Sequence, residues 1–286
     1  MGIVLRRCRW RLICDAARCE PPAGRLCSFY MYKGLFLYIC RNMIHDCFTF
    51  YNEFEVLRKR LRYLYTHVDK FVLVESTVTH SGQPKELFFD THKGMFAEYL
   101  DKIVHVVVKD NPVDDNPWSR ENHQRDCITR GLAGAGADDI VMISDVDEIP
   151  HIAVLETYKG APDVAAVNMY AFQYSFKYIQ DHEPWVGTVL TTRKHVDTTS
   201  PQKFRDTRWS YPMFVSAGWH LSSFGDAKHV YNKIKTFAHC NDGIHPTQTE
   251  EDFDKIVENG LWTDGKSKMP LTPAEVYDAI PKELTH

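Results

Sequence analysis

The chain has 286 residues, of which 44% are hydrophobic, 13% aromatic and 25% charged, with a formal net charge of -4. This length suffices for one large domain or two small ones, and the composition excludes disordered, collagen-like and coiled-coil classes. A mildly acidic chain also lacks the clustered basic face that sequence-independent nucleic-acid binding requires, so nucleic acid is not an expected partner.

The N-terminal segment differs in composition from the rest of the chain. The first 43 residues carry a net charge of +6, so the remainder carries -10, and they hold five of the eight cysteines. Residues 1–42 have three alternative interpretations, namely a membrane anchor or signal, a zinc site, or a leader outside the fold. The apolar stretch 28–40 is shorter than a spanning helix and contains Lys33, and the cysteines lack a C-x2-C pair. We therefore expect a disordered or wrongly assigned leader, followed by one domain over residues 43–286.

From residue 43 onward, strand and helix patterns alternate. Residues 44–50 are rich in β-formers, and residues 53–65 place apolar side chains at helical spacing. The apolar runs 71–75 and 103–108 predict two more strands, and turn-forming residues follow the first of them at 81–84. This order is typical of strands joined by helical crossovers.

The segment 111–150 repeats the alternation around a punctuated loop. Two Asn-Pro pairs lie between residues 111 and 117, Ser119 can cap a helix that runs to Leu132, and Ile140–Ile143 reads as a buried strand. The sequence therefore predicts an α/β fold, with a mostly parallel central sheet flanked by helices. Ligands bind such sheets at the carboxyl ends of the strands, where Glu75 and the residues after Ile143 lie.

After Pro150 the pattern is less regular and contains many aromatic residues. The run 170–176 fits either a sugar-binding platform or, as we favour, a core strand. The stretch Thr272–Leu284 opens with a capping Thr and Pro273, which predicts a helix. No second domain is expected.

The strongest chemical signal is Ser144-Asp145-Val146-Asp147-Glu148-Ile149-Pro150, directly after a buried strand. Two carboxylates one residue apart, where a strand turns, can both reach one hard divalent cation, which takes oxygen ligands and keeps positions open for phosphates. Such a cation neutralises the charge that develops on a departing nucleoside diphosphate. The Asp-x-Asp pattern at residues 145–147 is a weak signal by itself, because acidic residues are common in turns. The buried strand that precedes it makes the signal stronger.

Several segments resemble glycosyltransferase family 17 in order and spacing over about residues 43 to 240. The most specific is residues 138–150, and a later one is Gly-Trp-His at 218–220. The others are Asp46-Cys47-Phe48-Thr49-Phe50-Tyr51-Asn52-Glu53, Phe71-Val72-Leu73-Val74-Glu75-Ser76 and Trp118-Ser119-Arg120-Glu121-Asn122-His123-Gln124-Arg125. The first 43 residues have no counterpart that we recognise in the family's catalytic part.

The resemblance implies a GT-A-like fold, a nucleotide-sugar donor such as UDP-N-acetylglucosamine, a Mn2+ or Mg2+ ion, inversion at the anomeric carbon, and a glycan or glycoprotein acceptor. By the same resemblance, Asp145 and Asp147 are expected to form the metal and diphosphate site, with Glu148 beside them. Glu75 corresponds to an early acidic position that could accept from the nucleoside, the alternative being an exposed strand-end carboxylate.

Four further basic or imidazole side chains are candidates. Arg120 and Arg125 lie five residues apart, roughly 140° around a helix, so we expect only one of them to reach the diphosphate. The alternative is a solvated helix charge. His220 and His239 are candidate third metal ligands, although a lone histidine is usually structural, and the animal members of the family diverge before His239.

Inverting transfer needs a general base within hydrogen-bond reach of the acceptor hydroxyl. The sequence leaves two options open, Asp226 and Glu148, and either is equally well explained as a surface charge. The catalytic set expected from the sequence is thus Asp147, Glu148 and Asp226.

Two other functions compete with glycosyl transfer. A haloacid-dehalogenase-like phosphatase also uses Asp-x-Asp after a strand, but there the motif usually opens the fold and is followed by Thr or Val, where this chain has Ile149. A non-catalytic sugar-binding protein is the second alternative. P-loop and Rossmann fingerprints are absent from the sequence.

Location and acceptor are weakly specified. None of the nine Asn residues begins an N-x-[ST] sequon, which favours the cytoplasm, with a type II Golgi membrane protein as the alternative. Membrane association has weak support, from the stretch 28–40 alone. Nothing between Pro150 and Gly218 identifies the acceptor glycan.

Overall fold

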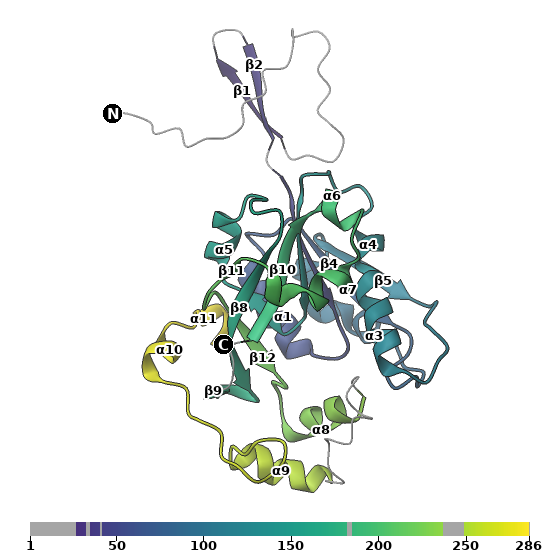
Figure 1. Ribbon diagram of the computed structural model, residues 1–286, viewed down its shortest axis with the longest axis vertical. Helices are drawn as coiled ribbons and strands as arrows, with labels where there is room; N and C mark the ends of the chain where they lie inside the picture. Colours follow the sequence, from purple (N-terminus) through teal and green to yellow (C-terminus); the bar gives the residue numbers. More distant parts are fainter. Residues whose placement is uncertain (1–26, 33–34, 41, 182–184, 237–248, 286) are drawn as a thin grey trace.

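The computed structural model describes residues 27–32, 35–40, 42–181, 185–236 and 249–285 (Figure 1). Strands β1 (Cys27–Tyr32) and β2 (Leu35–Cys40) pair antiparallel in a two-stranded sheet of their own. Most of the expected leader lies outside the described residues, so its status stays a prediction. The first strand of the main sheet follows directly, at Ile44.

The main sheet has ten strands, in the order β5-β4-β3-β6-β10-β8-β12-β7, with β9 and β11 also paired to β8. These strands are β3 (Ile44–Thr49), β4 (Lys70–Ser76), β5 (Ile103–Val108), β6 (Ile140–Asp145), β7 (Glu148–Pro150), β8 (Ala165–Gln173), β9 (Ser175–Ile179), β10 (Trp185–Thr192), β11 (Met213–Phe214) and β12 (Gly218–Ser222).

The sheet has two unlike halves. In the first, β5, β4, β3 and β6 are all parallel, with Cys47 of β3 opposite Val72 of β4 and Ile143 of β6. In the second, β10 runs antiparallel to both β6 and β8, and β12 pairs parallel with β8 and antiparallel with β7. The four strands expected from the apolar runs are all present in the first half, and the predicted α/β class is confirmed.

Helices and short helical turns cover the sheet. They are α1 (Phe54–Leu64), α2 (Phe88–His92), η1 (Lys93–Tyr99), α3 (Pro117–Asp126), α4 (Ile128–Gly131), α5 (Ile152–Thr157), α6 (Arg193–Val196), α7 (Pro201–Asp206), η2 (Arg208–Ser210), α8 (Ala227–Thr236), α9 (Glu250–Glu258), α10 (Ala274–Asp278) and α11 (Lys282–Thr285). None of the helices among the described residues is long and apolar enough to span a bilayer.

Strand β4 shows how the sheet is covered on both faces. Phe71 and Leu73 belong to the core cluster that contains the buried face of α1, whereas Val72 and Val74 belong to the cluster that contains Ile128 of α4. Alternate side chains of a strand point to opposite faces, so a continuously apolar strand is buried between two helical layers. This burial fixes where β4 and its neighbours end.

Two predicted helices differ from the structure. The helix expected from Ser119 to Leu132 begins at Pro117 instead, because Asn116 Oδ1 accepts a hydrogen bond from the Trp118 amide at 3.1 Å and Pro occupies the first turn. It is also interrupted at Cys127, where ψ is -6°. The single C-terminal helix expected over 272–284 is two short helices, because Pro281 cannot continue a helix.

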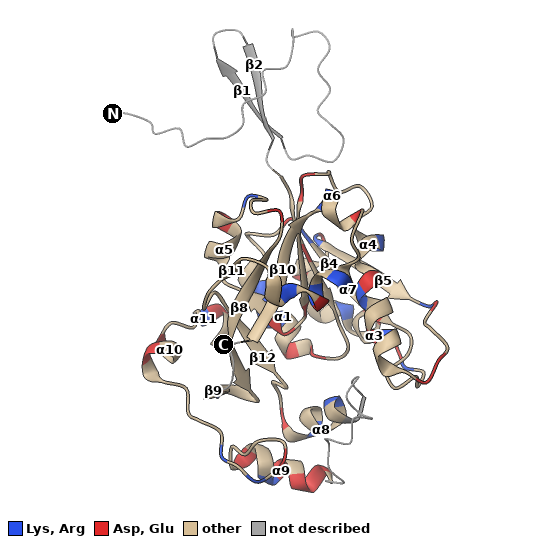
Figure 2. Ribbon diagram, viewed as in Figure 1, with Lys and Arg blue, Asp and Glu red and all other residues tan. Residues whose placement is uncertain are grey.

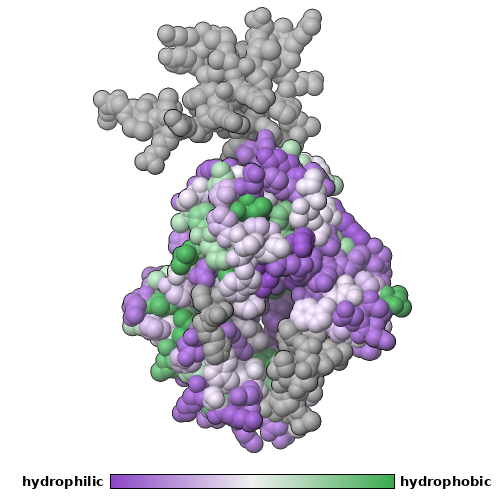
Figure 3. Space-filling view, viewed as in Figure 1, coloured by the Kyte–Doolittle hydropathy of each residue, from purple (hydrophilic) through white to green (hydrophobic). Residues whose placement is uncertain are grey.

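The aromatic run 170–176 is mainly core, as favoured. Phe172, Tyr174 and Phe176 are buried, and Tyr174 packs in a separate cluster with residues of α8 and α9. On the face shown in Figure 3, hydrophobic side chains form small separate spots in a mostly hydrophilic surface.

Candidate active site

A cavity of about 700 Å³ opens at the carboxyl ends of β3 and β6. Thr49 and Asp145 line it from these two strands, and His220 lines it from β12 in the other half of the sheet. Helices α3, α7 and α8 contribute further charged side chains, and Glu53, Lys85 and Arg208 line the cavity from outside these helices. Figure 2 shows basic segments on the neighbouring helices α3 and α7, which contact one another.

The loop from Asp145 to Glu148 is held from below by a buried arginine. Arg60 of α1 donates its Nη1 hydrogens to the carbonyl oxygens of residues 145, 146 and 148 at 3.1, 3.2 and 2.6 Å. Its Nε and Nη2 donate to both carboxylate oxygens of Asp46, at 2.7 and 2.5 Å. Because the fork geometry of guanidinium fixes direction, Arg60 determines how this loop faces the cavity.

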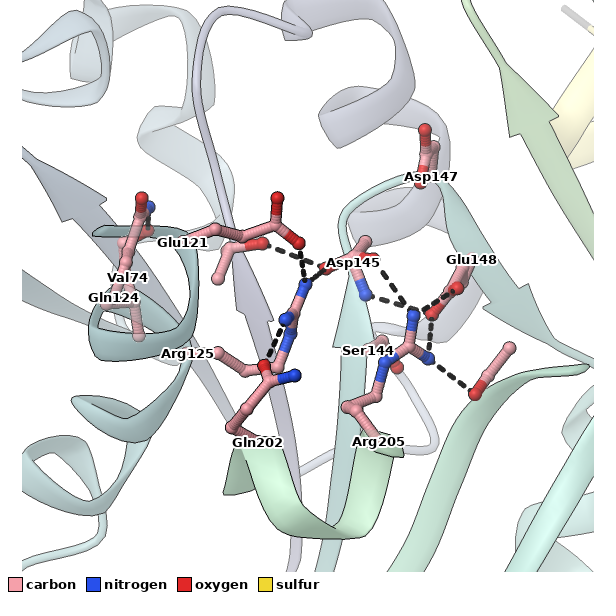
Figure 4. Close-up of polar contacts among 12 residues, drawn as sticks. Val74, Glu121, Gln124, Arg125, Ser144, Asp145, Asp147, Glu148, Gln202 and Arg205 are labelled. Carbon is pink, nitrogen blue, oxygen red and sulfur yellow. Dashed lines mark hydrogen bonds and ion pairs between the residues drawn. The ribbon is translucent and has the colours of Figure 1, made fainter. Parts of the chain in front are cut away.

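Asp145 lies between two arginines (Figure 4). Arg125 Nη2 is 2.8 Å from its Oδ1, Arg205 Nη2 is 3.0 Å from its Oδ2, and Thr49 also donates to Oδ1 at 3.1 Å. Burial alone would raise the pKa of Asp145, but the charges of Arg125 and Arg205 hold the pKa well below its ordinary value. Asp145 is therefore ionised and orients both arginines.

Glu148 is fully buried and does not line the cavity. Arg205 binds its two oxygens at 2.8 and 2.7 Å, Trp185 Nε1 donates to Oε1 at 2.8 Å, and the Asp145 amide donates to Oε2 at 3.0 Å. These contacts leave no oxygen facing a substrate. Glu148 thus positions the loop and Arg205, and its expected catalytic role has no geometric support.

Asp147 lies apart from this network, and its side chain points in a different direction from that of Asp145 (Figure 4). Lys233 Nζ of α8 is 2.9 Å from its Oδ2, and His220 Nε2 is 3.7 Å from its Oδ1. Burial would raise the pKa of Asp147, but the charge of Lys233 holds the pKa below its ordinary value. Asp147 is only 7% exposed, so it is a buried anion at the cavity wall.

His220 is a neutral imidazole held against an aromatic ring. It stacks on Trp185 with 4.2 Å between centroids and 14° between planes. Burial lowers its pKa, and its buried Nδ1 has no hydrogen-bond partner among the described residues. One ring nitrogen of a neutral histidine is a common ligand of a divalent cation.

The two arginines of α3 do not face the same site, as their spacing along the helix predicts. Arg125 lines the cavity, whereas Arg120 does not and donates to the carbonyl oxygens of His80, at 2.6 Å, and Asp114. Arg125 also donates to Glu121 Oε1 at 3.0 Å and to Gln202. Of the two arginines of α3, only Arg125 can therefore reach a ligand in this cavity.

Glu75 is neither exposed nor in the cavity wall. Its carboxylate accepts from the Phe88 and Phe89 amides at 2.5 and 3.2 Å, and Lys85 Nζ and His105 Nε2 are each 3.1 Å away. With both oxygens engaged, its expected contact with a nucleoside has no geometric basis. Its effect on the cavity is indirect, because it holds Lys85, which does line the wall.

The remaining candidates are Asp226 and His239. Asp226 is exposed and its Oδ1 accepts from the His229 amide at 2.8 Å, so it caps α8 and does not line the cavity. The expectation that it is a general base therefore lacks a geometric basis. His239 lies outside the described residues.

Four side chains that line the cavity were not singled out in the sequence, namely Glu53, Trp185, Arg205 and Lys233. Arg205 lies on α7, whose start is marked by Ser200 and Pro201, but nothing in the sequence points its side chain at residue 145. Lys233 contacts both Asp147 and Glu53, the latter with 3.5 Å between Nζ and Oε1. The pKa of Lys233 is raised by these two carboxylates against the effect of burial.

Comparisons with known proteins fit this geometry. The sequence profile of glycosyltransferase family 17 matches residues 23–263. The beta-1,4-mannosyl-glycoprotein 4-beta-N-acetylglucosaminyltransferases of Homo sapiens and Rattus norvegicus are each 29% identical to this chain. The matches cover 78% of this chain and 50% and 49% of those two proteins. The chain thus spans about half the length of the curated relatives that it matches.

Solved structures resemble the chain more distantly. A mannosyltransferase from Pyrobaculum calidifontis, in complex with GDP-Man and Mn2+, has a TM-score of 0.40 and 14% identity, over 76% of this chain and 68% of that one. HddC from Yersinia pseudotuberculosis has a TM-score of 0.39 and 10% identity, over 62% of this chain and 91% of that one.

Proposed function

The chain belongs to glycosyltransferase family 17, and from that premise we propose that it transfers N-acetylglucosamine from UDP-N-acetylglucosamine to a glycan acceptor, with a divalent cation and with inversion. The observation that carries the proposal is the charge arrangement in the cavity. Anionic Asp145 and Asp147 face a wall of cations, namely Lys85, Arg125, Arg205, Arg208 and Lys233. The names of the relatives support the donor sugar.

The cationic wall suits a nucleoside diphosphate. Arg125 and Arg205 are both oriented by Asp145. Arg125 Nη1 donates one hydrogen to Gln202 and has a second for a phosphate oxygen, whereas the Nη hydrogens of Arg205 are engaged by Glu148, Gly187 and Asp145. Arg125 can thus meet a phosphate oxygen without a large loss of side-chain entropy, and Arg205 contributes its charge. Preorganised donors aimed at developing charge are usually the largest contribution to catalysis. We assign direct contact with the diphosphate to Arg125, with Arg205 adding positive charge to the same wall.

The residues fit a divalent cation at one place. Asp147 Oδ1 and His220 Nε2 are 3.7 Å apart at the cavity, and His220 is neutral. Asp145 is turned toward its arginines, so Asp147 and His220 would hold the ion, and Lys233 would have to leave Asp147 Oδ2. When bound, the ion supplies positive charge to the departing diphosphate.

The general base we propose is Glu53, which replaces Asp226 and Glu148. Glu53 lines the cavity at the start of α1, its Oε2 accepts from the Tyr51 amide at 3.1 Å, and its Oε1 lies 3.5 Å from Lys233 Nζ. In the proposed step, the acceptor hydroxyl gives its proton to Glu53 as its oxygen bonds to the anomeric carbon. The bond from that carbon to the diphosphate breaks, and its electron pair leaves with the diphosphate.

Calorimetric titration of UDP and then UDP-N-acetylglucosamine into the full chain, with Mn2+ and again with EDTA, tests the donor site. We expect binding that needs the metal, and at least a tenfold loss of affinity in Asp147→Asn, with Asp226→Asn as the matched control. Metal-independent binding would remove the cation from the proposal. A folded protein that binds neither nucleotide would favour a sugar-binding protein or a phosphatase, which an acceptor-free phosphoester assay distinguishes.

A further inference from the structure

A second set of ligand-type side chains lies outside the cavity. Asp110 follows β5, His123 is on α3, and Cys127 lies between α3 and α4. Their ligand atoms all lie within 4.8 Å of one another. Among the described residues, this is the one group of three or more His, Cys, Asp or Glu side chains that converges so closely.

Two of the three ligand separations are close to those of a tetrahedral zinc centre. His123 Nε2 is 3.7 Å from Cys127 Sγ and 3.6 Å from Asp110 Oδ2. With the usual zinc bond lengths, tetrahedral ligands are about 3.6 Å apart for a nitrogen and sulfur pair and about 3.4 Å for a nitrogen and oxygen pair. The same ring nitrogen faces both partners, so one ion placed between the three atoms needs only small side-chain movements.

The ligand types and the neighbouring charge point to the same ion. Sulfur, imidazole nitrogen and carboxylate oxygen together suit zinc better than magnesium or calcium, which prefer oxygen alone. Arg130 binds both oxygens of Asp110 at 2.7 Å, and it can keep Oδ1 while Oδ2 turns to the ion. A carboxylate held in this way by a second residue is the usual support of a metal ligand.

We propose that Asp110, His123 and Cys127 bind one Zn2+ ion, with the fourth position open to water. The Cys127 S–H bond breaks on binding, its proton passes to solvent, and a zinc–sulfur bond forms. The ion would fasten the end of β5 to α3, the helix that places Arg125 and Gln124 at the cavity. The site is separate from the proposed transferase centre.

Titration of Co2+ into the full chain tests the proposal, because a thiolate ligand gives cobalt a near-ultraviolet charge-transfer band that carboxylate and histidine ligands do not. Competition with Zn2+ then measures zinc affinity. We expect one ion per chain with this band, loss of the band in Cys127→Ser, and binding at least about tenfold weaker in His123→Gln, since even supporting residues contribute 10- to 100-fold. Cys47→Ser, which alters a buried cysteine outside this group, is the matched control.

A band that persists in Cys127→Ser would place the thiolate elsewhere and overturn the proposal. Absence of any band in the folded wild-type chain would also overturn it. Circular dichroism of each variant checks folding, and Asp110→Asn, at an exposed position, gives a third test that leaves the core untouched. Because neither nucleotide nor acceptor is used, this result is independent of the proposed transferase activity.

Discussion

The parallel half of the sheet and its antiparallel half contribute differently to the site. The parallel half contains Asp145 and Asp147 at and after the end of β6, and Glu53 after β3. In this half, strands and helices alternate along the chain. The other half delivers Trp185 and His220 on β10 and β12, and the helices that follow its strands deliver Arg205 and Lys233. The first half supplies these anions together with Arg60 and Arg125, and the second half adds Arg205 and Lys233.

The largest expected effect comes from Glu53, on the side of the anions. Glu53→Gln should lower kcat about 10²- to 10⁴-fold, the usual contribution of a general base, while metal-dependent UDP affinity is retained. Rapid-quench kinetics with saturating donor, over a range of pH, measures this. The matched control is Glu55→Gln, an exposed carboxylate two residues away. If donor affinity and kcat fell by the same factor, Glu53 would have a role in donor binding and not that of a general base.

The next largest effect is expected from a substitution of Arg60, which lies on α1 in the parallel half. Arg60→Met should cost about 3–5 kcal/mol of unfolding free energy, because Asp46 would be left as an uncompensated buried charge. Urea unfolding followed by circular dichroism measures the loss. Arg58→Met, on the exposed face of the same helix, should change stability by less than about 0.5 kcal/mol. A similar small change in Arg60→Met would mean that the loop is held by other contacts.

Trp185 tests the second half. Trp185→Phe keeps a ring on His220 but removes the hydrogen bond to Glu148, which should cost about 1.5–3 kcal/mol in stability. Transfer activity should fall less than in Glu53→Gln, since Trp185 orients groups and does not react. Thermal and urea unfolding give the first value and steady-state kinetics the second. Trp209→Phe, at an exposed tryptophan, is the control for loss of an indole.

The smallest expected effect is on the pH dependence of stability, at Asp139 just before the start of β6. Burial would raise the pKa of Asp139, but hydrogen bonds from His45 and from the Gly136 and Met43 amides lower it. The stability that Asp139 contributes is thus present above its unfolded pKa of about 3.9 and is lost as the pH falls through the lower folded value. The free energy of unfolding, measured by urea titration at a series of acidic pH values, should fall less steeply with decreasing pH in Asp139→Asn than in the wild type. The same slope should be unchanged in Asp138→Asn.

Local signals in the sequence accounted for the parallel half. The four strands were found because each is a short apolar run, and the Asp145 loop was located because it follows one of them. Two helix details were also readable locally, since Asn116 before Pro117 is a capping signal and Asp226 stands three residues before the His229 amide that it caps. Both were missed because Ser119 and a catalytic role were preferred.

The partners of the anions could not be predicted in the same way. Arg205 meets a carboxylate 60 residues away, and Lys233 meets one 86 residues away. No local pattern marks which of the 34 basic residues will be buried beside an acid, because that depends on how β10 reverses the chain between β6 and β8. Glu75 shows the converse, since its strand-end position was predicted while its buried partners were not.

The insertion of β10 between β6 and β8 also has a consequence for biosynthesis. A nascent chain that has emerged only as far as the loop after β6 carries Asp145 and Asp147 without Arg205 and Lys233, and has only Arg125 to pair with Asp145. Contacts of such long sequence separation form late, because loop closure must come first. The full set of charges around Asp145 and Asp147 is therefore present only once α8 has been made, and a product truncated before α8 would have the Asp145 loop without the Lys233 that faces Asp147.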